Sequence, residues 1–275
     1  NPPVTEPMAI SKTIFFFISS CSSDVKTDAA YVIKDNKIVF NEPERIDGQK
    51  SVLQLAVDPI PVVRMGFIGL GMRGADAVNR ISHIEGVEFK ALCDLLPERV
   101  ESVQNWVIKG KGLPECAEYS GEEGWKQLCE RDDIDLVYIC TDWLNHVPMA
   151  VYAMQHGKHV AIEVPAATTV EECWQLVDVA EQTQRHCMML ENCCYDRNEM
   201  MVMRMVREGL FGDIVHCDGG YMHNCRFVFA PKETDPDVPN FRLESMEGRN
   251  FHFYPTHDFG PISKVLSVNR GNRMM

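Results

Sequence analysis

The feature that most constrains the fold is a glycine-spaced turn between a short apolar run and a helical segment. The stretch VRMGFIGLGMRG places Gly69, Gly71 and Gly74 at the end of the apolar run 62–68. Gly69 permits a tight turn, Gly71 admits a pyrophosphate close to the backbone, and Gly74 lets the helix pack on the strand. The free N–H groups at the helix N-terminus then attract phosphate. The pattern predicts a dinucleotide site on a Rossmann-type domain, and a glycine turn on a sheet without ligand is the alternative.

An acidic residue follows the next apolar run at the position where such domains bind ribose. Asp94 ends the run 87–93 and stands twenty residues after Gly74. A carboxylate at this place accepts hydrogen bonds from the adenosine ribose hydroxyls and repels a 2′-phosphate. The sequence therefore predicts NAD, rather than NADP, as the cofactor.

Strand-like and helix-like segments alternate over residues 61–190. The expected strands are 62–68, 87–93, 136–140, 159–162 and 187–190. The expected helices are 75–84, 97–110, 124–130, 147–156 and 169–184, with a loop at 111–120. This alternation predicts an α/β fold, in which helices cover both faces of a doubly wound parallel sheet.

After residue 190 the pattern changes. The expected elements are a helix at 199–208, a strand at 213–223, a proline-rich charged loop at 227–250 and a helix at 261–268. We therefore expect a Rossmann domain at 61–190, followed at 191–275 by the start of an α+β substrate domain with an open, incomplete sheet.

The N-terminal segment resembles a bacterial lipoprotein signal. Residues 8–21 read MAISKTIFFFISSC, with Lys12 before a short apolar run and a lipobox-like end at Cys21. This predicts a signal over 1–21, a lipid anchor at Cys21 and a place in the cell envelope, whereas a frayed apolar N-terminus would leave a cytoplasmic enzyme. A tether with short strands at 31–33 and 37–40 is expected over 22–60.

Charge and composition exclude several classes of partner. The net charge of −13 makes the surface repel phosphate backbones, so no nucleic-acid partner is expected. The eleven cysteines include no CxxC pair, and the nine histidines include no HExxH motif, so no metal site is predicted. The sequence leaves the oligomeric state open, with a homo-oligomer among the alternatives.

Several polar residues follow the predicted strands. In a doubly wound sheet ligands bind beyond the carboxyl ends of the strands, so we expect Trp143, Asn145 and His146 beside the nicotinamide. The alternative is a helix-capping turn with Asn145 as the cap. Glu163 and Glu191 follow the next two strands, and for each of them a solvated turn is as consistent with the spacing as a ligand contact.

Tyrosine and histidine pairs occur in the last third of the chain. Tyr221 and His223 alternate on an expected strand and share one face. Tyr254 and His257 lie three residues apart before a helix, an arrangement that suits proton transfer. A helix-start cap or a core histidine is the alternative for His257.

Together these segments resemble the Gfo/Idh/MocA oxidoreductases, and more closely glycoside hydrolase family 109, the NAD-dependent α-N-acetylgalactosaminidases. The resemblance is carried by residues 66–74, 141–165, 186–196, 220–223 and 254–261. It implies NAD contacts by Gly69, Gly71, Met72, Arg73, Gly74, Asp94, Trp143, Leu144, Asn145, His146, Glu163, Val164 and Asn192. It implies sugar contacts by Tyr221, Arg242, Tyr254, Pro255, Thr256 and His257.

Two departures distinguish the chain from ordinary dehydrogenases of this resemblance. Val164 stands where they carry the lysine of Glu-Lys-Pro, and Phe253 stands where they carry an aspartate four residues before His257. A chain without both groups is expected to be a poor net alcohol dehydrogenase. An NAD-dependent sugar dehydrogenase of the Gfo/Idh/MocA type is one alternative. Family members also continue past residue 275, so an inactive or binding-only truncated homologue is the other.

The resemblance implies hydrolysis of a glycoside or glycan with terminal α-linked N-acetylgalactosamine. The expected steps are oxidation at sugar C3, elimination across C2 and C1, addition of water, and reduction that regenerates the cofactor. We expect His257 to take the 3-hydroxyl proton, Tyr254 or Tyr195 to act near C2, and Arg242 to orient the substrate.

Overall fold

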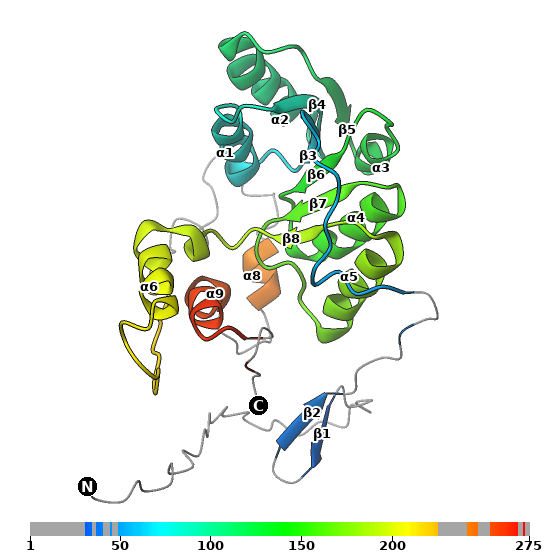
Figure 1. Cartoon of the computed structure of the whole chain (residues 1–275). Helices are drawn as coiled ribbons and strands as arrows, with labels where there is room; N and C mark the ends of the chain where they lie inside the picture. Colours follow the sequence, from blue (N-terminus) through cyan, green and yellow to red (C-terminus); the bar gives the residue numbers. More distant parts are fainter. Residues whose placement is uncertain are drawn as a thin grey trace, which may run out of the picture.

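The computed structural model describes residues 31–34, 37–40, 45, 49–224, 241–246, 254–268 and 272 (Figure 1). The lipoprotein signal expected at 1–21, with Cys21, lies outside the described residues, as does Phe253. Within the described part of the chain no helix is long and apolar enough to cross a bilayer. The short strands β1 (Tyr31–Lys34) and β2 (Lys37–Phe40) form the expected elements of the tether and pair as an antiparallel hairpin.

A six-stranded parallel sheet forms the centre of the molecule. Its strands are β3 (Val63–Ile68), β4 (Val87–Asp94), β5 (Ala117–Ser120), β6 (Leu136–Ile139), β7 (His159–Ile162) and β8 (Cys187–Met189). Their spatial order is β5-β4-β3-β6-β7-β8, the order of a doubly wound dinucleotide-binding sheet. The predicted parallel sheet is confirmed. The short edge strand β5 lies where a loop was expected. Its four residues contain no continuous apolar run, and only Ala117 and Tyr119 are partly buried against the core.

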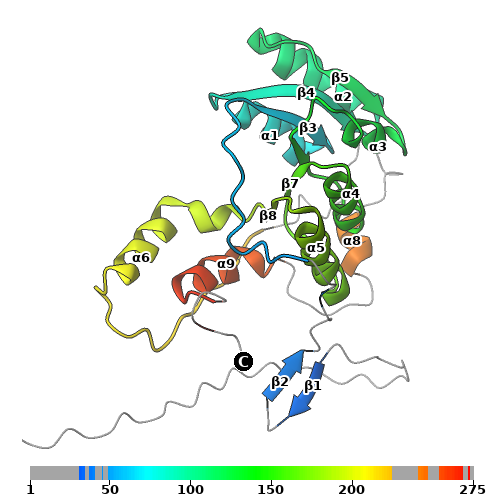
Figure 2. The ribbon, with the colours of Figure 1, turned by 45° about the vertical axis from the view of Figure 1, so that its right-hand side comes forward.

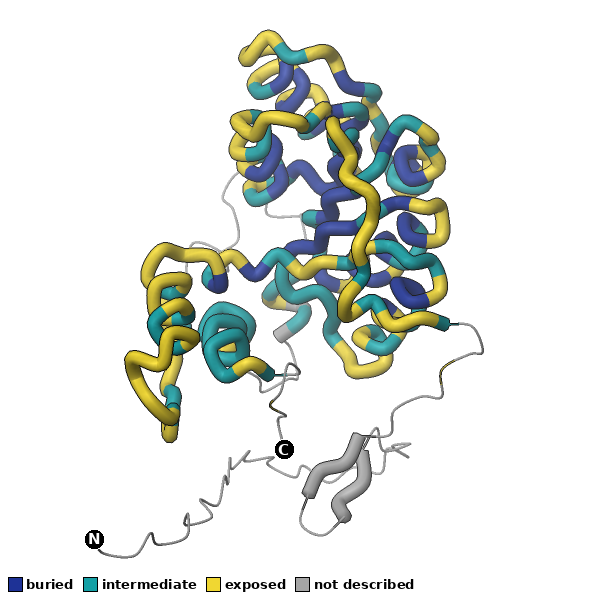
Figure 3. Tube along the Cα trace, in the orientation of Figure 1, coloured by how far each residue is buried: buried dark blue, intermediate teal, exposed yellow. Residues whose placement is uncertain are grey.

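Helices cover both faces of this sheet, as Figures 1 and 2 show. On one face lie α1 (Met72–Ile81), α2 (Pro97–Val103) and its continuation through the short π-helix η1 (Gln104–Ile108) and the short 3-10 helix η2 (Lys109–Lys111). On the other face lie α3 (Gly124–Cys129), α4 (Trp143–Gln155) and α5 (Val170–Thr183). Each set of helices packs its own apolar layer against the sheet, so the core lies in this lobe (Figure 3).

Side-chain caps decide where the two helices beyond β6 and β7 begin. Thr169 and Glu172 form a capping box at the start of α5, close to its predicted boundary. In α4 the cap is Asp142, which accepts from the N–H of Leu144 at 3.1 Å. The alternative that Asn145 is the cap is wrong, because Asn145 lies inside the first turn and donates to Asp142. The helix therefore begins four residues before the predicted start at residue 147.

The C-terminal segment is less deeply packed than the sheet lobe. It contains the 3-10 turn η3 (Asn192–Tyr195) and the helices α6 (Arg197–Arg207), α8 (Phe241–Met246) and α9 (Thr256–Val265). Neither α6 nor α9 has a fully buried residue (Figure 3). The strand expected at 213–223 is wrong, since these residues pair with no strand among the described residues and a lone strand leaves its backbone groups unbonded.

An ion pair joins Arg64 in β3 to Asp135 in the turn before β6. Asp135 accepts two hydrogen bonds from the Arg64 guanidinium, at 2.6 and 2.9 Å, and one from the Arg64 N–H at 2.9 Å. The hydrogen bonds from Arg64 lower the pKa of Asp135 below its usual value. The carboxylate therefore stabilises the folded state above the pKa of the unfolded chain, about 3.9, and this contribution is lost as the pH falls through the folded-state pKa.

We expect Asp135→Asn to lower the urea midpoint at pH 7, and to lower it less at a pH of about 3, because protonation removes the same charge from the parent chain. Urea unfolding followed by circular dichroism measures both midpoints. Asp76→Asn is the control, since Asp76 and Arg80 form an exposed pair on α1 that should contribute little at either pH. An equal deficit at both pH values would show that the charge of Asp135 is not what stabilises the fold.

Candidate functional site

The glycine turn after β3 has the tight geometry expected of a phosphate-binding loop. Gly69 has a φ of +88°, and a Cβ at Gly69 would lie 2.5 Å from the carbonyl oxygen of Cys140. A Cβ at Gly74 would lie 1.8 Å from the oxygen of Gly69, so α1 can start here only without a side chain. Gly71 is the N-cap of α1 and supplies no side-chain hydrogen bond. The first N–H groups of α1 are therefore left for an anion beyond the strand ends.

Asp94 lies beside this turn at the end of β4. Its Oδ2 accepts from the N–H of Leu70 at 2.6 Å, and its Oδ1 accepts from the N–H of Leu96 at 3.0 Å and faces Arg99 at 3.4 Å. The carboxylate is buried and holds the turn in place. Each carboxylate oxygen has two lone pairs, so ribose hydroxyls can still donate to it. The neighbouring Arg99 partly offsets the negative charge that was expected to repel a 2′-phosphate.

The loop between β6 and α4 also reaches the carboxyl edge of the sheet. Leu144 is 64% exposed there, close in sequence to Trp143, whose ring is buried and packs edge-on against Phe241 and Tyr254. Asn145 is exposed and donates to the helix cap. Trp143 therefore joins the sheet lobe to the C-terminal segment.

His146 lies in the first turn of α4. Its side chain is fully buried, with Nδ1 2.7 Å from the oxygen of Pro165 and Nε2 3.2 Å from that of Thr141. Burial lowers the pKa of this imidazole, against the opposing effect of the two carbonyl oxygens. The ring is thus enclosed by protein carbonyls and links the loops after β6 and β7. The predicted contact of His146 with the nicotinamide stays a prediction, and the structure adds that both ring nitrogens face protein carbonyls.

A buried carboxylate network follows β7. Glu163 accepts from Arg73 at 3.0 Å and from the hydroxyl of Tyr138 at 2.6 Å, and Arg73 also reaches Asn192 at 3.4 Å. Burial and the hydrogen bond to Glu163 raise the pKa of Tyr138, so its phenol is the donor. Glu163 is therefore no solvated turn, and with Arg73 it connects the glycine turn to β7 and η3. Val164, the next residue, is partly buried.

Four of the predicted sugar-binding residues form an aromatic cluster with α8 and α9. The ring of Tyr221 lies 4.7 Å from His257 and 5.9 Å from Tyr254, measured between centroids. Tyr254 stacks on His257 at 5.5 Å, and its hydroxyl accepts from Arg242 Nε at 3.0 Å. His223 stacks on the outer side of Tyr221 at 5.7 Å.

The remaining two predicted contacts lie at the start of α9. Pro255 is the N-cap residue of this helix. Thr256 follows it, and its buried hydroxyl has no hydrogen-bond partner among the described residues. The structure thus brings Tyr221, Arg242, Pro255 and Thr256 to the same region as Tyr254 and His257.

Tyr195 does not join this cluster. Its ring is 52% exposed and lies 3.8 Å from Lys264 Nζ, near the far end of α9. Lys264 and His257 are seven residues apart, which is about 10 Å along a helix. Of the two tyrosines expected to act near C2, the structure therefore favours Tyr254.

Glu191 is the functional candidate that sequence patterns left undecided. Its side chain is 5% exposed, and Oε1 lies 2.7 Å from Nδ1 of His257, whose side chain is 12% exposed. With Cys193, these residues offer three ligand atoms within 4.8 Å of one another, although no metal site was predicted. Burial, followed by the charge of Glu191, raises the pKa of the Cys193 thiol to about 11. Within this group the 2.7 Å contact between Glu191 and His257 forms a Glu–His pair.

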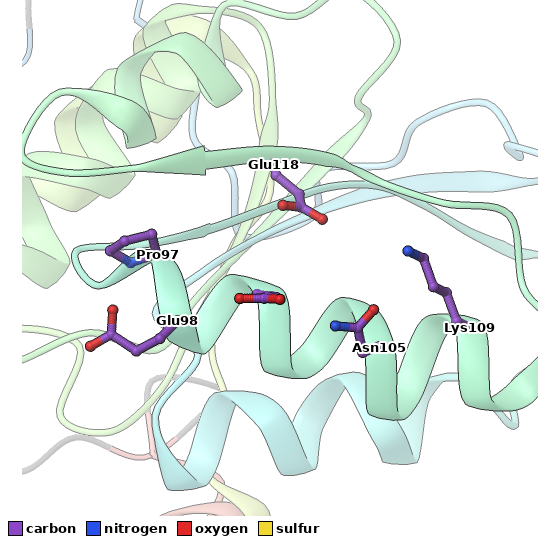
Figure 4. Close-up of a pocket in the computed structure, with 6 residues that line it drawn as sticks. Pro97, Glu98, Asn105, Lys109 and Glu118 are labelled. Atoms are coloured by element: carbon purple, nitrogen blue, oxygen red, sulfur yellow. The ribbon is translucent and has the colours of Figure 1, made fainter.

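A surface hollow of about 510 Å³ lies elsewhere, between α2, η1 and β5 (Figure 4). Three of its six lining side chains, Glu98, Glu101 and Glu118, are carboxylates, and Lys109 is its single cation. Such a surface repels phosphate, so the glycine turn is a better candidate for the dinucleotide site than this hollow.

Two protein families match adjoining parts of the chain. Residues 63–191 match the Gfo/Idh/MocA oxidoreductase family, NAD-binding Rossmann fold, and residues 195–275 match the glycosyl hydrolase 109 C-terminal domain. The WlbA dehydrogenase from Chromobactrium violaceum, solved with NADH and UDP-GlcNAcA, shares the fold with a TM-score of 0.50 and 19% identity. That alignment covers 57% of this chain and 44% of the dehydrogenase.

Curated relatives extend the likeness across both matches. An alpha-N-acetylgalactosaminidase of Bacteroides fragilis is 51% identical over 82% of this chain and 53% of its own length. A glycosyl hydrolase family 109 protein of Porphyromonas gingivalis is 52% identical over 86% of this chain and 50% of its own length. Glycosyl hydrolase family 109 protein 4 of Phocaeicola vulgatus is 45% identical over 94% and 51%. The chain spans about half the length of these relatives.

The sheet order and the glycine turn define a Rossmann fold of the NAD-binding kind, in line with the family that residues 63–191 match. The second match, and relatives about half identical to it, place the chain more narrowly. It belongs to glycosyl hydrolase family 109.

Proposed function

We propose that this site hydrolyses glycosides that end in α-linked N-acetylgalactosamine, with a dinucleotide held on the glycine turn. The relative named alpha-N-acetylgalactosaminidase and the family 109 match support the substrate class. The observation that carries the proposal is that the carboxylates after β7 and β8 are already paired, Glu163 with Arg73 and Glu191 with His257. Displacement by two carboxylates needs both of them facing the sugar. Proton transfer by His257 and Tyr254 does not.

The residues at the sheet edge fit NAD. The uncapped N-terminus of α1 suits the pyrophosphate, and exposed apolar side chains flank it, since Met72 is 73% exposed and Leu144 lies on the neighbouring loop. Asp94 supports NAD over NADP, because its carboxylate lies against the turn where the ribose is expected. When bound, NAD supplies reversible oxidation of the sugar carbon that bears the 3-hydroxyl.

The chain's own side chains supply the proton transfers. His257 takes the proton of the 3-hydroxyl. Tyr254 then removes the C2 proton, which a 3-ketone makes acidic, and the C1–oxygen bond breaks by elimination. Arg242 Nε donates a hydrogen bond to the Tyr254 oxygen at 3.0 Å, which fixes the position of the phenol beside His257. Water adds at C1, the proton returns to C2, and the 3-hydroxyl is restored.

Turnover in D₂O tests this proposal. The chain is incubated with NAD⁺ and p-nitrophenyl α-N-acetylgalactosaminide, and the released sugar is analysed by NMR. We expect deuterium at C2, because elimination exchanges that proton with solvent. Unlabelled released sugar would overturn the elimination mechanism. Steady accumulation of NADH with free sugar would instead identify a sugar dehydrogenase.

Tyr254 and Tyr195 provide a matched pair of phenols. We expect Tyr254→Phe to lower the turnover number about 10²-fold, because it removes the group that transfers the C2 proton. Tyr195→Phe should leave turnover within about twofold, since its ring contacts Lys264 on the opposite end of α9. Steady-state kinetics of both variants decide between the phenols. A larger loss in Tyr195→Phe would reverse the assignment.

A further inference from the structure

Two local features bring Glu191 and His257 into contact, one in η3 and one in α9. Glu191 follows β8 and caps η3, where its Oε1 accepts from the N–H of Cys193 at 2.9 Å. Across from it, Gly260 lets α9 approach closely, because a Cβ there would lie 2.8 Å from Glu191 Cγ and 2.9 Å from Cys194 Sγ. The absence of a side chain at Gly260 therefore allows the histidine on α9 to reach the carboxylate on η3.

The chemistry of the two groups fixes where the histidine carries its proton. An ionised carboxylate only accepts hydrogen bonds, so the ring nitrogen that faces it must carry hydrogen. Nδ1 of His257 faces Glu191 Oε1 at 2.7 Å. In a neutral ring Nε2 is then the acceptor, and it lies on the side of the imidazole away from Glu191. A histidine held this way accepts a proton through Nε2.

We propose that Glu191 is a positioning residue for His257, which holds the proton on Nδ1 and presents Nε2 as the base for the sugar 3-hydroxyl. The role of Nε2 as a base for the sugar rests on the function proposed above. The pairing of Glu191 with His257 and the tautomer do not. Glu191 comes 66 residues before His257 in the chain. It supplies to this histidine the carboxylate that Phe253 does not.

A double-mutant cycle tests whether Glu191 acts through His257. We expect Glu191→Gln to lower the turnover number about 10²-fold with an unchanged KM, because the amide keeps the size of the side chain but loses its charge. In a His257→Ala background the same substitution should change the residual turnover less than about threefold. An equal fold-loss in both backgrounds would overturn the proposal, since a merely structural residue acts independently of His257.

NMR of the ring nitrogens gives a readout that needs no turnover. The chain with ¹⁵N-labelled histidine and saturating NAD⁺ is compared with Glu191→Gln, and the His257 signals are identified by their loss in His257→Ala. We expect the Nδ1–H form in the parent chain and a shift toward Nε2–H in Glu191→Gln, whose amide can donate to Nδ1. An Nε2–H form in the parent chain, or no change in Glu191→Gln, would refute the pairing.

Two further variants separate the pairing from local damage. Gly260→Ala keeps the side chains of Glu191 and His257 but forces α9 away from η3. It should therefore shift the His257 signals and lower turnover. Glu208→Gln, on an exposed pair with Arg204, should change neither. If the parent chain releases no sugar while the tautomer behaves as stated, the proposed function fails and the pairing stands.

Discussion

Gly74→Ala should destroy dinucleotide binding and destabilise the fold. Its Cβ would lie 1.8 Å from the backbone oxygen of Gly69 and 3.6 Å from Cys140 Cβ, so either α1 or the turn must move. Forcing atoms into a packed site costs about 1–3 kcal/mol, occasionally more, and the clash here is with backbone. We expect the free energy of unfolding to fall by about 3 kcal/mol. The affinity for NAD should fall about 100-fold, which corresponds to a similar energy.

Chemical denaturation and a fluorescence titration with NAD measure these two effects, and Gly71→Ala is the matched control. A Cβ at Gly71 would approach only Arg99 Nη1, at 3.9 Å, and the residue has an extended backbone. This variant should keep its stability within about 0.5 kcal/mol. It should still bind NAD more weakly, because the methyl group enters the space expected for the pyrophosphate. Equal destabilisation by both substitutions would contradict the helix-packing role of Gly74.

His257→Ala should nearly abolish release of N-acetylgalactosamine while leaving NAD binding unchanged. The ring pairs with buried Glu191 and stacks on Tyr254 at 5.5 Å, and we have proposed it as the base for the 3-hydroxyl. Loss of a general base costs about 10²–10⁴-fold in rate. We expect a decrease of about 10³-fold in turnover number, measured by release of p-nitrophenol.

The control for this substitution is His216→Ala, because His216 is exposed and lies between α6 and the cluster in sequence. It should retain turnover within about twofold. The NAD affinity of both variants is measured in parallel by fluorescence titration. Retention of more than a tenth of the parent activity in His257→Ala would show that another group takes the 3-hydroxyl proton.

The pattern of the sequence predicted most of the sheet lobe, for a local reason. Buried parallel strands are short apolar runs, and the glycine turn constrains the chain whatever surrounds it. Predictions failed where a distant partner decides the structure. The edge strand β5 exists because β4 pairs with it, and residues 213–223 lack a strand partner among the described residues. The start of α4 was misplaced because the sequence offers two possible caps, and the structure uses Asp142 instead of Asn145.

The candidate site divides in the same way. That Asp94, Glu163 and Glu191 lie at one edge follows from their positions after parallel strands. What each carboxylate does there does not follow, because its partner is far along the chain. Tyr138 gave no signal at all, since it lies within an apolar strand and only the fold shows its hydroxyl on Glu163. The burial of the His146 ring could not be predicted either, because its position after β6 indicates only the edge of the sheet.

The sequence by itself determined the class of fold and the edge at which ligands are expected, because strand periodicity and glycine stereochemistry are properties of neighbouring residues. Only the tertiary structure decided the pairings, since Arg73 and Glu163 are 90 residues apart and Glu191 and His257 are 66 apart. A carboxylate is a solvated turn or a buried partner depending on what packs over it. For Glu191 the packing of α9 at Gly260 made that choice.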